Sequence, residues 1–423
     1  MKIQLAKGVK DINPEEKIKK NEIVQTIQKY FELYGYNPLD TPIIERFDVL
    51  ASKYAGGSEI LKETFKLNDQ GERDLCLRYD LTVPFARYIA TTPTIKLPFK
   101  RYQIGQVFRD GPIKAGRFRE FTQCDADVVG SKDMLSEAEL LKIASLVFND
   151  LKIDVEIKVN NRKVLDAIMK KSGIPEDKWM SSILSLDKIE KIGRSGVESE
   201  LSENGLDKKM IDSLLMLTED KSSTKKNLEF LKKELGDEPV KEIESLFDYL
   251  NLMNTKVSFI PSLARGLAYY TGTVYEVFAK DSEIKSSIAA GGRYDKMIGD
   301  FVRNNQEYPA VGLSFGVDVI FEVVKRKTQA LKKTTVKALL ISIKTNSETL
   351  KLAEFLRENN VSVEINSFNK NISKGLEYAS AYEILFVVFI GENELNEEKY
   401  KIRDMLSGKE QLVDKQKLVK FLG

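Results

Sequence analysis

The sequence predicts an α+β fold in two parts: a core built on an antiparallel sheet, and a smaller α/β unit after it. Three patterns support this prediction: short apolar runs separated by turn residues before residue 130, a helical Lys/Glu-rich stretch over about 163–254, and alternating strands and helices after residue 334. We therefore expect the domain boundaries to be 1–325 for the core with its helical insertion, 326–334 for a basic linker and 335–423 for the second unit.

The first element is expected to be a helix that starts at Pro14. Asn13 is a favoured N-cap residue, Pro14 suits the first helical position, and Gly35 provides a typical C-terminal stop. Residues 36–44 contain two prolines, which exclude a helix, so this segment is expected to be extended.

A long antiparallel hairpin is expected over residues 101–129. Residues 101–108 and 118–129 have the composition of strands, and residues 110–116 between them contain two glycines and a proline. The loop is basic, and arginine offers a rigid fork for phosphate oxygens, so these residues predict phosphate binding. For the charges alone, a solvated loop is the alternative. The basic residues concerned are Arg109, Lys114, Arg117 and Arg119.

A helix over 136–149 and a strand over 155–159 are expected next, followed by the helical insertion and then by strands over 256–260 and 273–278. In the second unit, strands over 336–343, 361–365 and 384–390 alternate with helices, the first of which would be capped by Asn346 or Ser347. This βαβαβ order predicts a small, mainly parallel sheet.

Composition restricts the chemistry. The 423 residues include no histidine, which excludes Ser-His-Asp and Cys-His nucleophile sites and zinc sites that use histidine. Neither a P-loop nor a Rossmann glycine pattern occurs. The net charge of +2 means that nucleic acid would be contacted by local patches. The two cysteines, Cys76 and Cys124, build no disulfide framework. Neither a membrane-spanning run nor a secretory signal is apparent. We therefore expect a cytoplasmic protein.

Three further strings combine polar residues with glycine. Residues 263–273 place Arg265 before the pair Tyr269 and Tyr270; a turn with core tyrosines is an equally good interpretation. Residues 289–296 and 309–318 put glycines beside strands, where a ligand can lie on the sheet, although Gly-Gly more commonly marks a simple turn.

Asp80 and Thr82 are two residues apart and would share one face of a strand, where Asp80 is suited to hold an amine. The alternative is a turn that leads into a helix started by Pro84.

Together these strings resemble the histidyl-tRNA synthetases, which are class II aminoacyl-tRNA synthetases, over nearly the whole chain. The resemblance implies the class II antiparallel-sheet core and, after residue 334, a class IIa anticodon-binding domain. The matching segments are Gly35–Pro42 (motif 1, the dimer interface), Phe108–Asp127 (motif 2), Leu263–Glu276 and Gly291–Asp295 (the two histidine signatures) and Val311–Ile320 (motif 3).

The resemblance implies ATP-dependent ligation of L-histidine to tRNA(His) through a histidyl-adenylate, by a homodimer that uses ATP and Mg²⁺. It also implies a role for each matching residue. At the nucleotide, Arg109 would bind the ATP α-phosphate and Arg265 would stabilise the charge that develops there; the other residues at the nucleotide would be Arg117, Arg119, Gly312 and Gly316. The amino group of histidine would be held by Asp80, Thr82 and Gln123. The imidazole would be bound by Asp127 and Tyr270, in a pocket lined by Tyr269 and Tyr294.

Two positions depart from the family pattern. Val319 stands where motif 3 usually has arginine, and Ala268 stands where the histidine signature usually has aspartate. The main alternative is therefore a non-catalytic paralogue that senses histidine or tRNA, which Val319 favours and which Arg109, Arg265 and Gln123 oppose. A dimeric RNA-binding protein without catalysis is the third interpretation.

Overall fold

The structure is a computed structural model that describes residues 3–54, 58–113, 116–265, 269–303, 306–327, 330–366 and 371–423. The chain divides into two compact units, one made of residues 1–10 and 22–327 and the other of residues 11–21 and 328–423. Among the described residues, no helix is both long enough and apolar enough to cross a bilayer.

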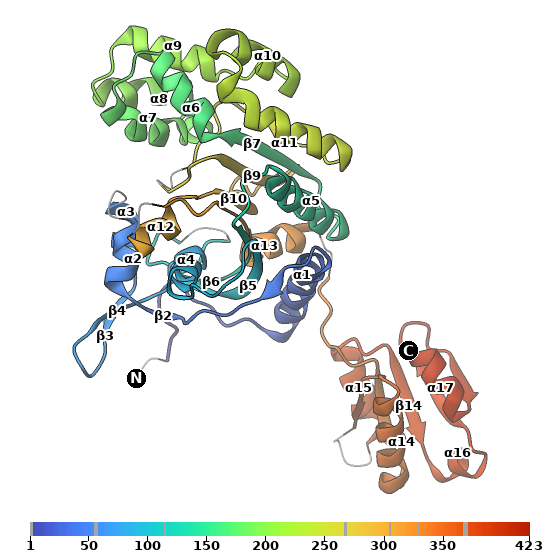
Figure 1. The fold of residues 1–423 in the computed structure, drawn as a ribbon. Coiled ribbons are helices and arrows are strands. Elements are labelled where there is room, and N and C mark those ends of the chain that lie inside the picture. Colours follow the sequence, from blue (N-terminus) through green and yellow to red (C-terminus); the bar gives the residue numbers. More distant parts are fainter. Residues whose placement is uncertain are drawn as a thin grey trace. The chain divides into compact units, whose positions relative to one another are not determined.

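An eight-stranded sheet forms the centre of the first unit and confirms the antiparallel-rich core (Figure 1). Its strand order is β1-β5-β6-β11-β10-β9-β7-β8, and only the outermost pairs, β1 with β5 and β7 with β8, are parallel. The strands are β1 (Asn37–Pro38), β5 (Phe99–Phe108), β6 (Glu120–Val129), β7 (Val155–Asn161), β8 (Ser258–Phe259), β9 (Thr273–Ala279), β10 (Ala289–Arg293) and β11 (Ala310–Gly316).

The predicted hairpin is confirmed, because β5 and β6 pair in one antiparallel register from Phe99 opposite Val129 to Phe108 opposite Glu120. The sequence did not reveal a second, three-stranded sheet in the order β2-β4-β3. Its strands are β2 (Ile44–Arg46), β3 (Lys66–Asn68) and β4 (Asp74–Leu77).

Helices cover the two faces of the large sheet. On one face, Phe31 of α1 (Pro14–Leu33) and Phe148 of α5 (Leu135–Asp150) pack on Phe315 of β11, with ring centroids 5.9 and 5.6 Å apart. The other face carries α4 (Thr82–Thr91), which shares an apolar cluster with α12 (Met297–Val302). The remaining core helices are α2 (Phe47–Tyr54), α3 (Ser58–Lys62) and α13 (Val317–Lys327).

The start of α1 follows the local signals. Asn13 Oδ1 accepts a hydrogen bond from the Glu16 amide at 2.9 Å, as a capping side chain does. After the helix, Gly35 has φ +77°, a conformation that favours glycine, and the chain then turns into β1.

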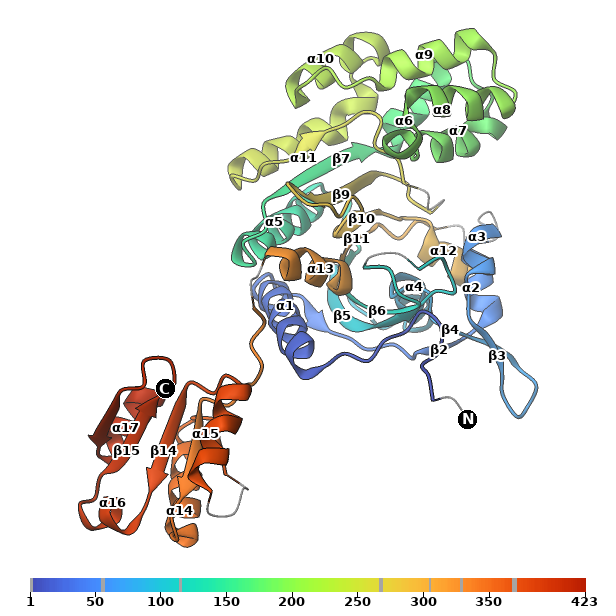
Figure 2. The same cartoon turned by 180° about the vertical axis from the view of Figure 1, so that it is seen from behind.

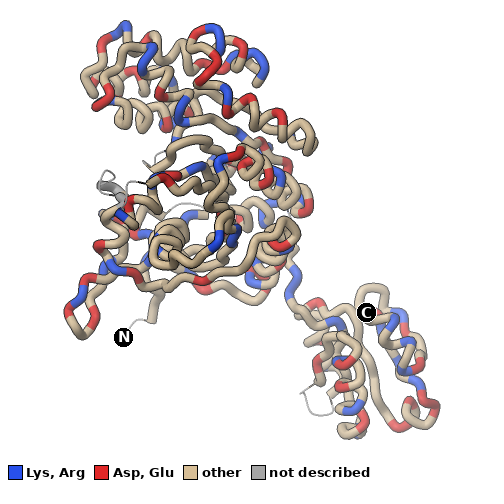
Figure 3. Tube along the Cα trace, viewed as in Figure 1, with Lys and Arg blue, Asp and Glu red and all other residues tan. Residues whose placement is uncertain are grey.

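The helical insertion is confirmed and lies beyond β7, as Figures 1 and 2 show. In the charge-coloured view, Lys/Arg and Asp/Glu are interspersed along its helices (Figure 3). It consists of α6 (Arg162–Lys171), α7 (Trp179–Leu186), α8 (Ile189–Glu203), α9 (Lys208–Thr218), α10 (Thr224–Leu235) and α11 (Lys241–Leu252), with 3₁₀ turns at Glu176–Lys178 and Glu238–Val240.

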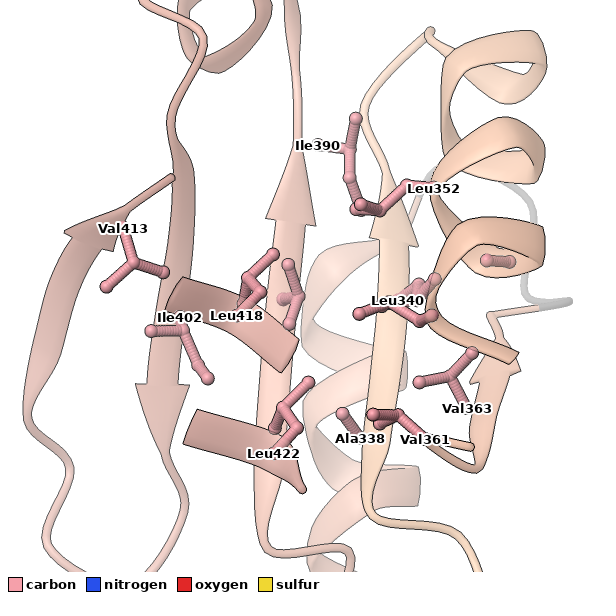
Figure 4. Close-up of a cluster of buried hydrophobic side chains, with 13 residues drawn as sticks. Ala338, Leu340, Leu352, Val361, Val363, Ile390, Ile402, Val413, Leu418 and Leu422 are labelled. Carbon is pink, nitrogen blue, oxygen red and sulfur yellow. The ribbon is translucent and has the colours of Figure 1, made fainter. Parts of the chain in front are cut away.

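The second unit has its own core. Leu340 and Ile390 on neighbouring strands belong to one apolar cluster with Leu352 and Leu418 from the helices that cover the sheet, as Figure 4 shows. The sheet order is β13-β12-β14-β15-β16, in which the first three strands are parallel as predicted and the last two add antiparallel strands that were not predicted. The strands are β12 (Ala338–Ser342), β13 (Val363–Ile365), β14 (Phe386–Ile390), β15 (Tyr400–Asp404) and β16 (Glu410–Val413); the helices are α14 (Asn346–Glu358), α15 (Ile372–Ala381), α16 (Glu392–Asn396) and α17 (Lys415–Leu422).

Two local predictions need correction. The residue before α14 is Thr345, so neither Asn346 nor Ser347 is the N-cap; Thr345 instead uses its hydroxyl to donate to the Ile390 carbonyl at 2.6 Å. Helix α13 continues through Lys327, which places Arg326 and Lys327 in a helix instead of the expected linker.

Candidate functional site

The candidate site lies on the sheet face that carries α4. Side chains alternate between the two faces of a strand, so every second residue points to the same side. Residues that pair directly across neighbouring strands also share a face. Gln123, Asp125 and Asp127 of β6 therefore point to the same side. Pairing extends this alignment into three rows across β5, β6 and β11: Gly105–Gln123–Gly316, Gln103–Asp125–Ser314 and Arg101–Asp127–Gly312.

Asp127 is held at both carboxylate oxygens. Its Oδ1 accepts a hydrogen bond of 2.5 Å from the Tyr294 hydroxyl, and its Oδ2 lies 2.7 Å from Nη2 of Arg101, in an ion pair without hydrogen-bond alignment. Burial raises the pKa of Asp127, and the Arg101 charge and the Tyr294 hydrogen bond oppose that rise. Two protein groups thus orient the Asp127 carboxylate.

Arg101 is a fully buried cation under this pocket. Its Nη2 donates to the Leu81 carbonyl at 3.1 Å, just before α4, and its guanidinium carbon lies 4.2 Å from the centroid of the Phe85 ring. A buried guanidinium requires an anionic partner, and Asp127 provides one.

Gln123, Ser314 and Asp125 form a polar chain in the middle of the face. The Gln123 amide donates to the Ser314 hydroxyl at 2.6 Å, which leaves the Ser314 proton for Asp125. Gln123 Oε1 and Asp125 Oδ1 are buried without a hydrogen-bond partner. Burial raises the pKa of Asp125 to about 7, although Arg101 and Ser314 act in the opposite direction.

Arg109 lies at the end of β5 between two aromatic rings. Its guanidinium carbon is 4.3 Å from the centroid of Tyr79 and 5.0 Å from that of Phe121, and its Nε donates to the Tyr79 carbonyl at 3.2 Å. Across the hairpin, Arg119 forms an ion pair of 2.7 Å with Asp110. The rings fix the position of a positive charge at the mouth of the pocket.

Arg265 pairs with β9, whereas Arg109 follows β5, and β6, β11 and β10 lie between these two strands. Arg265 Nη1 forms an ion pair of 2.7 Å with Glu276 of β9, which also accepts from the Ser287 hydroxyl at 3.2 Å. Burial acts to lower the pKa of Arg265, but Tyr270 and Glu276 raise it above its ordinary value, so the residue is a fixed cation.

A pair of tyrosines packs beside Tyr294 on the same face. The Tyr269 and Tyr270 rings lie 4.7 Å apart, and Tyr269 meets Tyr294 edge-on at 6.2 Å. A Cβ at Gly292 would come within 2.9 Å of the Tyr270 ring, so the glycine allows this ring to lie on the sheet. The segment from Gly266 to Ala268, including the departure at 268, lies outside the described residues.

The strand expected for Asp80 and Thr82 is wrong. Strand β4 ends at Leu77 and Thr82 is the first residue of α4, so the alternative of a turn into a helix is the observed one. Asp80 Oδ1 accepts from the Val83 amide at 3.0 Å, which stabilises the start of this helix because a carboxylate satisfies a free amide there.

Gly312 lies next to the Asp127 carboxylate. A Cβ at this position would lie 2.0 Å from Asp127 Oδ1, so glycine makes room for the Asp127 carboxylate. Gly316, in contrast, has only ordinary contacts around it, the nearest being the Ile288 carbonyl at 3.8 Å. Arg117 is exposed beside Gly116, and Val319 packs against Gly116, whose virtual Cβ would be 3.3 Å from Val319 Cα.

Sequence reasoning missed Arg101, Asp125, Phe121 and Glu276. A charge at every second position of a strand, as at 125 and 127, is the signal that could have identified the acidic pair and its buried counterion. No sequence pattern indicates which charge pairs with which, because the partners come from different strands.

In the described part of the chain, no group of three or more His, Cys, Asp or Glu side chains is arranged to hold a metal ion. Mg²⁺ commonly uses one or two carboxylates together with substrate phosphates.

Comparisons with known proteins agree with this geometry. Residues 8–320 match the family model described as histidyl-tRNA synthetase, and residues 332–423 match an anticodon binding domain. The chain is 44% identical to histidine–tRNA ligase 1 of Bacillus cereus, with 97% of this chain and 95% of that protein covered, and 36% identical to histidine–tRNA ligase of Phocaeicola vulgatus, with 98% of each covered.

Among solved structures, histidyl-tRNA synthetase from Nostoc sp. PCC 7120 superposes with a TM-score of 0.88 at 29% identity and covers 100% of this chain and 99% of that one. The resemblance inferred from the motifs is therefore confirmed over both units. The chain belongs to the histidyl-tRNA synthetase family, whose full-length relatives are histidine–tRNA ligases.

Proposed function

We propose that the protein ligates L-histidine to tRNA(His) in two steps: ATP activates histidine as histidyl-adenylate, and the terminal ribose of the tRNA then attacks the adenylate. The observation that carries this proposal is the arrangement of one sheet face, on which two cations, Arg109 and Arg265, lie on either side of buried polar side chains of β5 and β6. Full-length relatives named histidine–tRNA ligase support the same activity.

Arg109 and Arg265 would act on the α-phosphate of ATP. Phosphoryl and adenylyl chemistry requires mainly positioned positive charge, and both guanidinium groups are held in place before the substrate arrives, by Tyr79 and Phe121 in one case and by Glu276 in the other. Mg²⁺ carried by the nucleotide would neutralise further phosphate charge.

Gln123 would position the amino end of histidine, because its unpartnered Oε1 is an acceptor at the open end of the β6 row. Tyr270 would lie against the imidazole above Gly292. Asp80, which stabilises the start of α4, and Thr82 would border the pocket at the same level.

The transfer step needs a base, and the chain contains no histidine. A non-bridging phosphate oxygen of the adenylate lies next to the carbonyl under attack, so it meets the geometric requirement for that base. Arg265 and Gln123 would position the groups without taking the proton.

Two surfaces would bind macromolecules. Residues 36–44, which include the edge strand β1, would form a symmetric dimer interface; Ile43 and Ile44 in this segment are 44% and 52% exposed. Residues 335–423 would bind the anticodon side of tRNA(His), as the match to an anticodon binding domain suggests. The protein would then act as a homodimer in the cytoplasm.

The test is ATP–pyrophosphate exchange with each of the twenty amino acids, followed by charging of tRNA(His). We expect exchange with histidine alone and transfer to tRNA(His). Histidine binding without exchange would establish the non-catalytic paralogue instead, the alternative that Val319 favours by removing the usual motif 3 arginine.

A further inference from the structure

A row of directly paired residues crosses the large sheet from the candidate site to the strand that precedes the helical insertion. From Ser314 of β11, the row continues through Ala290 of β10 and Glu276 of β9 to Lys158 of β7. Because paired residues share a face, Glu276 and Lys158 lie on the same side of the sheet as the candidate site. Lys158 is therefore the neighbour, across the ladder, of the carboxylate that holds Arg265.

Within the described chain, Glu276 and Lys158 are nevertheless not ion-pair partners. Opposite charges that face each other across a ladder usually attract. Here Lys158 Nζ pairs instead with Glu190 at 2.6 Å and, more distantly, with Glu156 at 3.8 Å. Glu276 pairs with Arg265 at 2.7 Å. Two cations thus lie beside one carboxylate, and only Arg265 uses it.

The acid that occupies Lys158 comes from the helical insertion. Glu190 lies in the first turn of α8, and Gly193 interrupts the helix just after it with φ +70°, a conformation that favours glycine. A Cβ at Gly193 would meet nothing within 4 Å, so backbone conformation explains this glycine and packing does not. The same part of the insertion is within electrostatic range of the catalytic cation: burial raises the pKa of Asp187, just before α8, Glu276 adds to the rise, and Arg265 opposes it.

We propose that Glu190 is a positioning residue for the reaction: by pairing with Lys158 it keeps that lysine away from Glu276, so that Glu276 holds Arg265. This inference rests on the proposed function, in which Arg265 acts on the α-phosphate. Without Glu190, Lys158 would still have Glu156, but that side chain is 42% exposed and Glu276 is 18% exposed. The less exposed carboxylate is less screened by water and salt, so it attracts the lysine more strongly. Lys158 would then compete with Arg265 for Glu276.

The consequence is that the helical insertion influences adenylate formation through Glu276. A positive charge contributes fully to catalysis only while its geometry is fixed before the substrate arrives. Loss of the Glu190 contact would keep Arg265 in the protein but loosen its guanidinium group. The rate of adenylate formation should therefore fall, whereas the affinity for histidine should not.

The experiment measures histidine-dependent ATP–pyrophosphate exchange for Glu190→Gln, Lys158→Met and the double variant, with saturation curves that give kcat and the KM values for histidine and ATP. Glu198→Gln is the matched control. Glu198 also lies on α8 and also forms an ion pair, but with Arg194 of its own helix, at 3.0 Å. Circular dichroism verifies that each variant is folded.

We expect Glu190→Gln to lower kcat roughly twofold to fivefold with little change in either KM, as for the loss of one partly exposed ion pair. Lys158→Met should exchange near the native rate, because Glu276 then has a single cationic neighbour. The double variant should therefore recover most of the native kcat, and Glu198→Gln should match the native protein. A merely structural contact would not be restored by the removal of its own partner.

The proposal is overturned if Glu190→Gln exchanges as the native protein does, if the double variant stays as slow as Glu190→Gln, or if Glu198→Gln is equally slow. Absence of histidine-dependent exchange in the native protein is a different result. It would refute the proposed function itself, and this inference with it.

Discussion

Arg101 and Asp127 lie directly opposite each other in the β5–β6 ladder and form an ion pair of 2.7 Å in which neither side chain is more than 3% exposed. Such a pair is built into the sheet itself, because the antiparallel register brings the two Cα atoms together. It places a buried guanidinium beside Asp127, the carboxylate that the family resemblance assigned to the imidazole.

Arg101→Met should destabilise the folded protein by about 3–5 kcal/mol, because it leaves Asp127 as an unpaired buried charge. Urea denaturation followed by circular dichroism measures this loss. The double variant Arg101→Met with Asp127→Asn should recover part of the loss, since no unpaired charge remains. If the two substitutions prove additive, the pair does not couple as the geometry indicates.

The stability of the protein should depend on the ionisation of Asp125. Burial raises its pKa from an ordinary 3.8 to about 7, so the folded state binds a proton that the unfolded state has lost between these values. The contribution of Asp125 to the free energy of unfolding is fully present below pH 3.8, declines as the pH rises, and is lost above about pH 7. The groups that influence Asp125 are Arg101, Asp127, Asp80 and Ser314.

Asp125→Asn removes this decline. Between about pH 5 and pH 8 the native protein should lose on the order of a few kcal/mol relative to the variant, as measured by urea denaturation without histidine. The variant should therefore gain stability relative to the native protein as the pH rises from about 5 to about 8. A constant difference across this range would contradict the raised pKa.

Arg265→Ala should reduce adenylate formation by about two to three orders of magnitude, as expected when a preorganised charge is removed from the reacting phosphate. Histidine affinity should change far less. Glu276→Gln is the matched control: it retains the cation and removes its 2.7 Å anchor, so a smaller decrease is expected. Exchange kinetics at saturating histidine and ATP provide the measurement, and near-normal exchange in Arg265→Ala would contradict the assignment.

Gly312→Ala should weaken histidine binding at least tenfold and lower the melting temperature, because the new Cβ would meet Asp127 Oδ1 at 2.0 Å. Gly316→Ala on the same strand is the control, since its nearest neighbour would be 3.8 Å away. Kd values for histidine and for ATP, measured for both variants, show which ligand each variant binds more weakly. Equal loss of ATP affinity in both variants would support the predicted nucleotide role for these glycines.

Ending the chain at Lys327 should weaken charging of tRNA(His) much more than histidine-dependent exchange. The second unit has its own apolar core, so the first should fold without it. Charging and exchange assays on the same preparation provide the comparison. Equal losses in both assays would show that the second unit is required for the folding of the first.

The sequence by itself determined the elements whose signals are local. The Asn13–Pro14 helix start, the stop at Gly35, the β5–β6 hairpin and the helical insertion all follow from capping residues, periodicity and turn composition within short windows. The family assignment has the same basis. Each family motif lies on one hairpin or one turn, so its residues are contiguous in the sequence and can be recognised there.

Only the tertiary structure decided which residues meet. The environments of Arg101, Asp125 and Gly312 depend on the register of the β5–β6 hairpin against β11, which is far from it in sequence, and the pairing of Arg265 with Glu276 depends on how Arg265 lies against β9. A strand pattern predicts which face a side chain occupies, but not its neighbour across the ladder. That neighbour determines whether a carboxylate is committed to a protein cation or left available for a substrate.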